Sequence, residues 1–274
     1  MPETLTSFPV AVAQFAPTDD RVHNRDLIAA FTAVAAARGA RLVVFPEYSS
    51  FFVDPLSEAF VHNAETLEGE FVGALAEAAR EHEVFVVAGL VEKTDEARRF
   101  SNTLVAVSPL GDVVATYRKQ HLYDAFGAQE SEWVVPGALD APQTFDIDGM
   151  RVGMQTCYDI RFPEVTRRLV DVGAELVLVP AEWVRGPLKE HHWSTLVTAR
   201  AIENTIYVAA ADHTPPIGVG TSLIVDPMGV AIAALGETAG VAVAEVSRAR
   251  IREVREANPS LALRRYEVRP KPAS

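Results

Sequence analysis

Short apolar strands alternate with amphipathic helices along this chain, and that alternation restricts it to folds in which helices are layered on sheets. In the first third of the chain the pattern predicts, in order, a strand at 8–14, a helix at 21–37 ended by Gly39, a strand at 42–45, a helix at 67–82 and a strand at 84–91. This order of elements is typical of an α/β protein.

Two hairpins interrupt the alternation. Strands between 103 and 117 flank the turn Pro109-Leu110-Gly111-Asp112, and strands at 223–225 and 230–234 flank Asp226-Pro227-Met228-Gly229. Between the hairpins we expect a strand ending just before Cys157, a helix at 163–172, a strand at 175–179, a helix at 187–203 and a strand at 205–211. Hairpins join antiparallel strands, so the pattern predicts mixed sheets in a two-sheet layout.

Composition limits the classes of protein to which the chain can belong. It has 274 residues, 49% of them hydrophobic, and neither a linker nor a repeat divides it, so we expect a single domain over 1–274. The net charge of -12 argues against a nucleic-acid partner. No apolar run is long enough to cross a bilayer, and the N-terminus lacks the pattern of a signal peptide. The lack of such a run leads us to expect no membrane partner. One cysteine cannot form an internal disulfide, so we expect a cytoplasmic protein.

That cysteine, Cys157, stands at a turn where an apolar strand ends and a helix begins near Pro163. A side chain at such a turn projects past the sheet edge, and the unpaired N–H groups of the helix N-terminus favour a thiolate and any oxyanion formed from it. The alternative is a small, buried and unreactive hydrophobic side chain. The turn therefore makes Cys157 a candidate nucleophile.

Two more charged residues follow predicted strands. Glu47 comes after the strand at 42–45 and a proline, and Lys119 comes directly after the hairpin strand that ends at 117. Each alone could be an ordinary surface charge. Because open sheets gather functional groups at the carboxyl ends of their strands, we expect Glu47, Lys119 and Cys157 to converge on one crevice.

Three segments contain these residues in a fixed order: Phe45-Pro46-Glu47, Arg118-Lys119-Gln120-His121-Leu122 and Cys157-Tyr158-Asp159-Ile160-Arg161-Phe162-Pro163-Glu164. The ordered set resembles the nitrilase, or carbon–nitrogen hydrolase, superfamily, and the resemblance extends over nearly the whole chain. A second glutamate of that family is matched by Glu130, which precedes Pro136-Gly137, although Glu130 is also readable as an ordinary loop acid beside Glu132.

The resemblance implies a four-layer α-β-β-α sandwich whose subunits pair through their helical faces into a homodimer or a higher homo-oligomer. It also implies amide hydrolysis with Cys157 as nucleophile, Glu47 as general base, and Lys119 with the backbone N–H of Tyr158 as oxyanion stabilisers. Glu130 would orient Lys119 or the substrate amide. No cofactor and no metal are expected, since the histidines match no zinc-binding pattern.

The substrate is the least determined feature. The segment that follows Cys157 resembles the amidases of the superfamily more than its nitrilases or carbamoylases. Arg161 either binds a substrate carboxylate or forms an internal ion pair with Asp159 or Glu164, and we expect the ion pair. Trp183 is the first candidate for an apolar pocket wall, Tyr48 and Phe126 are weaker ones, and packing in the core is the alternative for all three.

We therefore expect an amidase for short aliphatic primary amides. The alternatives are an ω-amidase acting on amides of dicarboxylic or 2-oxo acids, an N-carbamoyl hydrolase or nitrilase using the same residues, and, more remotely, a non-catalytic binding protein on this scaffold.

Overall fold

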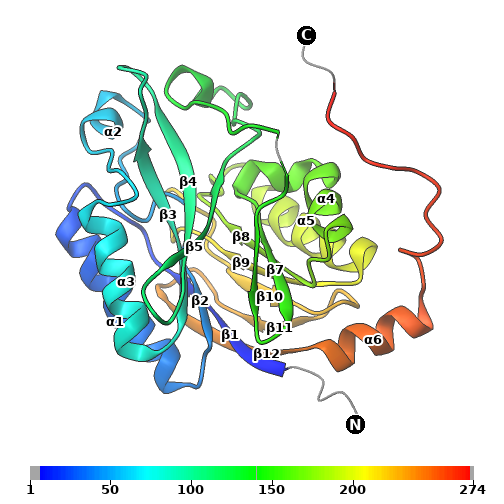
Figure 1. The fold of residues 1–274 in the computed structure, drawn as a ribbon. Coiled ribbons are helices and arrows are strands. Elements are labelled where there is room, and N and C mark those ends of the chain that lie inside the picture. Colours follow the sequence, from blue (N-terminus) through cyan, green and yellow to red (C-terminus); the bar gives the residue numbers. More distant parts are fainter. Residues whose placement is uncertain (1–6, 140, 272–274) are drawn as a thin grey trace.

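Two six-stranded mixed sheets pack face to face at the centre of the computed structural model, which describes residues 7–139 and 141–271 (Figure 1). The first sheet has the strand order β12 (Gly240–Ser247), β1 (Ser7–Gln14), β2 (Leu42–Val44), β3 (Phe85–Lys93), β4 (Phe100–Val107) and β5 (Val113–Arg118). The second has the order β11 (Ala231–Ala234), β10 (Leu223–Val225), β9 (Tyr207–Ala211), β8 (Leu176–Pro180), β7 (Met150–Met154) and β6 (Thr144–Ile147).

Alternating side chains explain why both faces of these sheets are covered. Val10 and Val12 of β1 point into the core between the sheets, whereas Ala11 and Ala13 pack on the outer side of the first sheet. Because successive residues of a strand face opposite sides, a strand buried on both faces must be apolar throughout. The continuous apolar runs of the sequence therefore form the inner layers.

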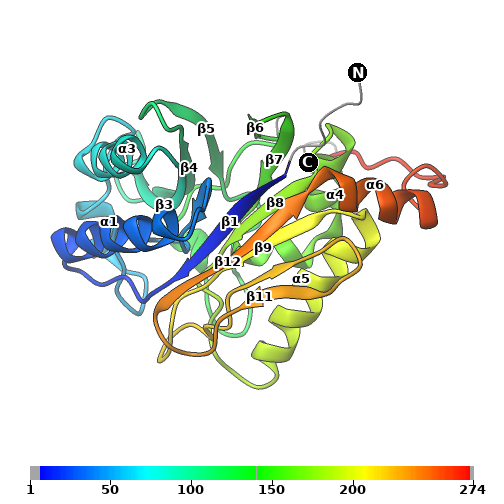
Figure 2. The same ribbon diagram turned by 90° about the horizontal axis from the view of Figure 1, so that it is seen from below.

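Helices form the two outer layers, one pair on each sheet (Figure 2). Their bounds, with those of two further helices, are α1 (Arg21–Ala37), α2 (Glu58–His62), α3 (Glu70–His82), α4 (Pro163–Asp171), α5 (Lys189–Asn204) and α6 (Arg248–Ala257). α1 and α3 cover the first sheet, and α4 and α5 cover the second. The carboxylate of Asp20 caps α1 by accepting hydrogen bonds from the N–H groups of Val22 and His23.

The predicted α-β-β-α sandwich with mixed sheets is confirmed, and most predicted elements lie within three residues of the observed ones. Among the α-helices and strands of the described residues, α2, β6, β12 and α6 were not predicted. The two near the C-terminus have weak sequence signals. β12 is only partly buried, and α6 buries just Ile251 and Val254, so neither has the strong apolar pattern of an inner element.

Within the described ranges, 7–139 and 141–271, no helix combines the length and the apolar character that crossing a membrane requires. The expected single domain over 1–274 stays a prediction.

Gly89 of β3 fixes the position of the segment that follows β2. Its N–H donates to the carbonyl of Pro46 at 3.1 Å, and its own carbonyl accepts from the N–H of Ser50 at 3.0 Å. A Cβ at this position would lie 2.7 Å from the Cα of Glu47 and would also meet the backbone nitrogen of Tyr48. The close approach of the two backbones therefore requires a glycine.

We expect Gly89→Ala to destabilise the protein by about 1–3 kcal/mol and to displace Glu47, because backbone atoms cannot move aside as a flexible side chain can. Thermal unfolding and amide turnover measure the two effects. Gly73→Ala is the matched control: nothing lies within 4 Å of its Cβ position in α3, so it should stabilise by about 0.5–1 kcal/mol. Equal melting temperatures for the two variants would contradict this account.

Candidate active site

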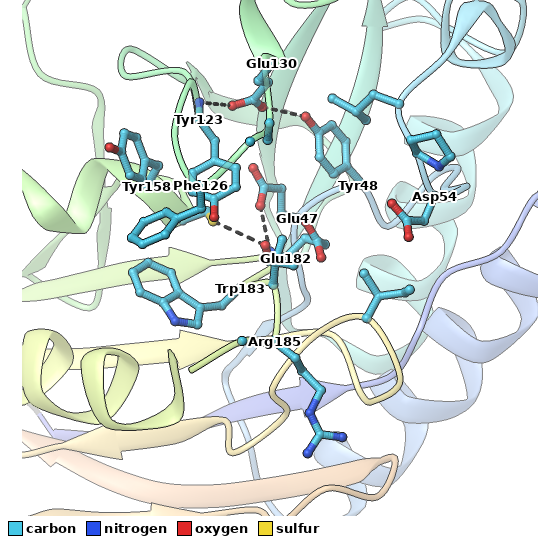
Figure 3. Close-up of a pocket in the computed structure, with 18 of the residues that line it drawn as sticks. Glu47, Tyr48, Asp54, Tyr123, Phe126, Glu130, Tyr158, Glu182, Trp183 and Arg185 are labelled. Carbon is cyan, nitrogen blue, oxygen red and sulfur yellow. Dashed lines mark hydrogen bonds between the residues drawn. The ribbon is translucent and has the colours of Figure 1, made fainter. Parts of the chain in front are cut away.

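The carboxyl ends of strands from both sheets meet at one cavity of about 790 Å³ (Figure 3). Glu47 follows β2 and Lys119 follows β5, which runs in the same direction as β2 because two antiparallel steps separate β3 from β5. Cys157 follows β7, and Glu182 follows β8 of the second sheet. All four line the cavity, so the predicted convergence at strand ends is what the structure shows.

Lys119 lies between two buried carboxylates. Its Nζ is 2.9 Å from Oε1 of Glu47, 3.0 Å from Oε1 of Glu130 and 2.9 Å from Oε2 of Glu130. Burial raises the pKa of Glu47, and Lys119 opposes that rise. Burial alone lowers the pKa of Lys119, but the two carboxylates outweigh it and raise that pKa well above its ordinary value. The ammonium is therefore held charged.

Asn102 and Tyr48 complete this network. The Nδ2 of Asn102 donates to Oε1 of Glu47 at 2.6 Å and to Oε1 of Glu130 at 3.2 Å. The hydroxyl of Tyr48 donates to Oε1 of Glu130 at 2.7 Å, so Tyr48, expected as a pocket wall, also holds the second glutamate. Asn102 was not predicted, because the strand was expected to begin at 103. Its signal was a polar residue next to the apolar run of β4.

The backbone of Glu182 links Glu47 to Cys157. Its N–H donates to Oε2 of Glu47 at 2.6 Å, and its carbonyl lies 3.5 Å from Sγ of Cys157. Cys157 has a φ of 43°, in the left-handed region that costs a non-glycine residue energy. The fold supplies that energy and holds the thiol at this edge.

The expected thiolate is not what this environment favours. Burial, together with the carboxylate of Glu47, raises the pKa of the Cys157 thiol well above its ordinary value, although Lys119 partly opposes the shift. The environment therefore favours the thiol over the thiolate at Cys157. The helix N-terminus near Pro163 does not overcome this burial.

Asp159 ties the turn at Cys157 to the segment at Lys119. Its carboxylate accepts from the hydroxyl of Tyr117 at 2.7 Å and from the N–H of His121 at 2.9 Å, and these two residues flank Lys119. It also accepts from the N–H of Thr156 at 3.2 Å. Asp159 was expected as an ion-pair partner of Arg161, and that expectation is wrong.

Arg161 instead lies among aromatic rings. Its guanidinium carbon is 4.8 Å from the centroid of Trp183 and 5.6 Å from that of Phe126, and Nη2 is 3.3 Å from Nδ1 of His192. In the part of the chain that the structure describes, Arg161 forms no ion pair with Asp159 or Glu164. Arg161 is not among the residues that line the cavity.

Aromatic side chains form one wall of the cavity. Figure 3 shows Tyr123, Phe126, Tyr158 and Trp183 on one side of Glu47, with Tyr48 and Asp54 on the other. Trp183 is buried, and its Nε1 donates to the carbonyl of Lys189 at 2.9 Å. Phe126 is 72% exposed at the rim. The predicted wall residues therefore face the cavity, while Tyr123 was not predicted.

No group of three or more histidine, cysteine or acidic side chains suited to a metal ion occurs within residues 7–139 and 141–271.

Comparisons with known proteins identify the family of the chain. A family model described as carbon–nitrogen hydrolase matches residues 9–256. Deaminated glutathione amidase from Escherichia coli O157:H7 is 42% identical over 257 residues, covering 94% of this chain and 97% of that protein. Omega-amidase NIT2 from Homo sapiens is 30% identical over 277 residues, covering 96% and 97%.

Solved structures have the same fold. The NitFhit protein of C. elegans superposes with a TM-score of 0.86 at 29% identity, covering 96% of this chain and 66% of that longer one. A mutant of the amidase from Nesterenkonia sp. AN1, described as showing Michael addition of acrylamide at the active site cysteine, has a TM-score of 0.75 at 28% identity and covers 93% and 100%. This chain belongs to the carbon–nitrogen hydrolase family, and it is an enzyme that acts on amides.

Proposed function

We propose that the protein hydrolyses amides of acyl chains that end in a carboxylate, through a thioester on Cys157. The observation that carries the proposal is the buried ion pair of Lys119 and Glu47, joined to Cys157 through the backbone of Glu182 in one cavity. A protonated thiol beside an ionised carboxylate is the pair that base-assisted attack on an amide requires.

In the first half of the reaction, Glu47 takes the thiol proton while Sγ of Cys157 bonds to the amide carbon. The carbonyl oxygen becomes an oxyanion, stabilised by the ammonium of Lys119 and the backbone N–H of Tyr158. Glu47 then gives the proton to the amide nitrogen, the C–N bond breaks, and the amine or ammonia leaves. Glu130 supports the step by keeping Lys119 charged and in place.

In the second half, water enters and Glu47 takes one of its protons. The resulting hydroxide attacks the thioester carbon, and a second oxyanion forms at the same donors. The C–S bond breaks, the thiolate recovers the proton from Glu47, and the carboxylic acid is released. The chain's own residues supply every proton transfer in this scheme.

The size of the cavity and the named relatives favour a larger substrate than the expected short aliphatic amide. A volume of about 790 Å³ falls in the upper part of the usual range for small-molecule sites, so acetamide-sized compounds would leave most of it empty. Two similar proteins are named as amidases of deaminated glutathione and of omega-amides. We therefore replace the expected substrate with the ω-amide class. Hydrolysis of carbamoyl compounds or nitriles remains a secondary activity to test.

The homodimer and the cytoplasmic location, both expected from the sequence, stay predictions. Size-exclusion chromatography with light scattering measures the first, and fractionation of the source cells measures the second.

Mass spectrometry of the intact protein tests the nucleophile. After brief exposure to an ω-amide and quenching in acid, the wild type should carry one acyl adduct on Cys157, whereas Glu47→Gln should carry less, because loss of the base slows formation of the thioester. Cys157→Ala should carry none and should show no turnover, while its melting temperature stays close to the wild type. Glu47→Gln and Lys119→Ala should each lower turnover by ~10²–10⁴. Wild-type turnover in folded Cys157→Ala would disprove the assignment.

The protonation state of the thiol gives an independent test. Because the Glu47 carboxylate helps to raise the pKa of Cys157, Glu47→Gln should lower that pKa. The rate of alkylation by N-ethylmaleimide as a function of pH reports it, and the single cysteine makes the signal unambiguous. Glu132→Gln, an exposed neighbour of Glu130, is the control and should match the wild type. An unchanged alkylation profile in Glu47→Gln would exclude an ionised Glu47 beside the thiol.

The acid limb of the pH–rate profile, where the rate of amide hydrolysis falls as the pH drops, tests whether Glu47 is the base. Burial raises the pKa of Glu47, so its carboxylate form, and with it activity, is lost as the pH falls through a value above the ordinary one of 4.5. The Glu130 carboxylate contributes to that rise, so Glu130→Gln should move the acid limb to lower pH while also reducing the rate. Glu132→Gln should leave the limb in place. A shift of the Glu130→Gln limb to higher pH would contradict this electrostatic account.

A further inference from the structure

Lys189 is a buried cation in the same cavity that the proposed reaction steps do not use. Its side chain lines the cavity, and the residue is only 5% exposed. The Nζ lies 4.8 Å from the ring centroids of Phe126 and Trp183 and 4.9 Å from that of Tyr123. It also donates to the hydroxyl of Tyr123 at 3.1 Å. Three ring faces and one hydroxyl therefore hold the ammonium in place.

Lys189 lacks the carboxylate partners that the other two cations of the cavity have. Lys119 is paired with Glu47 and Glu130, and Arg185 is paired with Glu190 at 3.7 Å and Glu237 at 3.0 Å. Among the residues that the structure describes, no aspartate or glutamate lies within 4.0 Å of the Lys189 Nζ. Because an ammonium removed from water without a counter-ion is costly, this position favours an anionic ligand.

The surroundings of Lys189 strengthen the preference for an anion. Helix α5 begins at Lys189 without a side-chain cap, so the positive end of its dipole faces the same region. The guanidinium of Arg161 lies against Trp183 and Phe126 as well. Burial, the largest cause, and Arg161 lower the pKa of Lys189, and a bound carboxylate would reverse that effect.

The opposite end of the cavity has the opposite character. Asp54 and the side chain of Glu182 lie toward Tyr48, away from the aromatic wall (Figure 3). Burial raises the pKa of Glu182 well above its ordinary value, and the Asp54 carboxylate adds to that rise. The Asp54 carboxylate would repel an anionic group at that end, whereas Lys189 would attract it at the other. This polarity fixes the orientation of a substrate that carries a single carboxylate.

We propose that Lys189 binds the carboxylate of the substrate's acyl chain and so determines specificity for ω-amides over neutral amides of the same length. The inference rests on the proposed function. In this arrangement the acyl chain runs along Trp183 and Phe126 from the thioester carbon toward the ammonium, and the leaving amine points toward Tyr48 and Asp54.

The test compares matched substrates in matched variants. Succinamate and glutaramate are paired with butanamide and pentanamide, in which a methyl group replaces the carboxylate. We expect Lys189→Met to lower the ratio of kcat/KM for the charged over the neutral amide by about 10- to 100-fold, since a charge-assisted hydrogen bond is lost. The loss should be mainly in KM. Lys93→Met, at an exposed residue of β3, should leave the ratio unchanged.

A second measurement does not depend on turnover. Isothermal titration of glutarate into Cys157→Ala should give binding that is lost in the Cys157→Ala/Lys189→Met double variant, whereas Cys157→Ala/Lys93→Met retains it. If no amide is hydrolysed but glutarate binding depends on Lys189, the proposed function fails and the anion site stands. If amides are hydrolysed but neither the ratio nor glutarate binding changes in Lys189→Met, the inference is wrong. A ratio that falls in Arg161→Lys but not in Lys189→Met would assign the carboxylate to Arg161 and also overturn it.

Discussion

The ion network of Lys119, Glu47 and Glu130 is the constraint on which the rest of the site depends. A buried ammonium with two buried carboxylates is stable only when every charge is paired and hydrogen-bonded. The amide of Asn102, the hydroxyl of Tyr48 and the backbone N–H groups of Glu182 and Tyr123 supply those bonds. A change at any one donor therefore affects the position of Glu47, the proposed base.

Two-sheet packing brings this network to the thiol. Glu47 and Lys119 follow strands of the first sheet, while Cys157 and Glu182 follow strands of the second, and neither sheet alone contains the site. Asp159 joins the two sheets at this edge through hydrogen bonds with residues on both sides of Lys119. The hydrophobic core between the sheets and this one carboxylate together determine where the thiol lies relative to the ammonium.

The two ends of the cavity differ in charge. The end nearest Tyr48 and Asp54 is acidic. The aromatic end contains Lys189, and no carboxylate of the residues that the structure describes lies within 4.0 Å of its Nζ. Rings of Trp183, Phe126 and Tyr123 keep the ammonium in place without neutralising it. The proposed carboxylate base and the proposed carboxylate-binding subsite can therefore coexist, because the two charges lie at different places in the cavity.

Sequence alone determined the layers and pointed to the three residues of the proposed chemistry. Strand alternation and helix periodicity are local properties, and Glu47, Lys119 and Cys157 each follow a predicted strand whose end places them at a sheet edge. Only the tertiary structure decided what each charge contacts. Asp159 pairs with Tyr117 and His121 and not with Arg161, burial raises the pKa of the Cys157 thiol, and Asn102 and Lys189 enter the site from distant segments. These facts depend on desolvation and on contacts between residues far apart in the chain, which local sequence patterns do not encode.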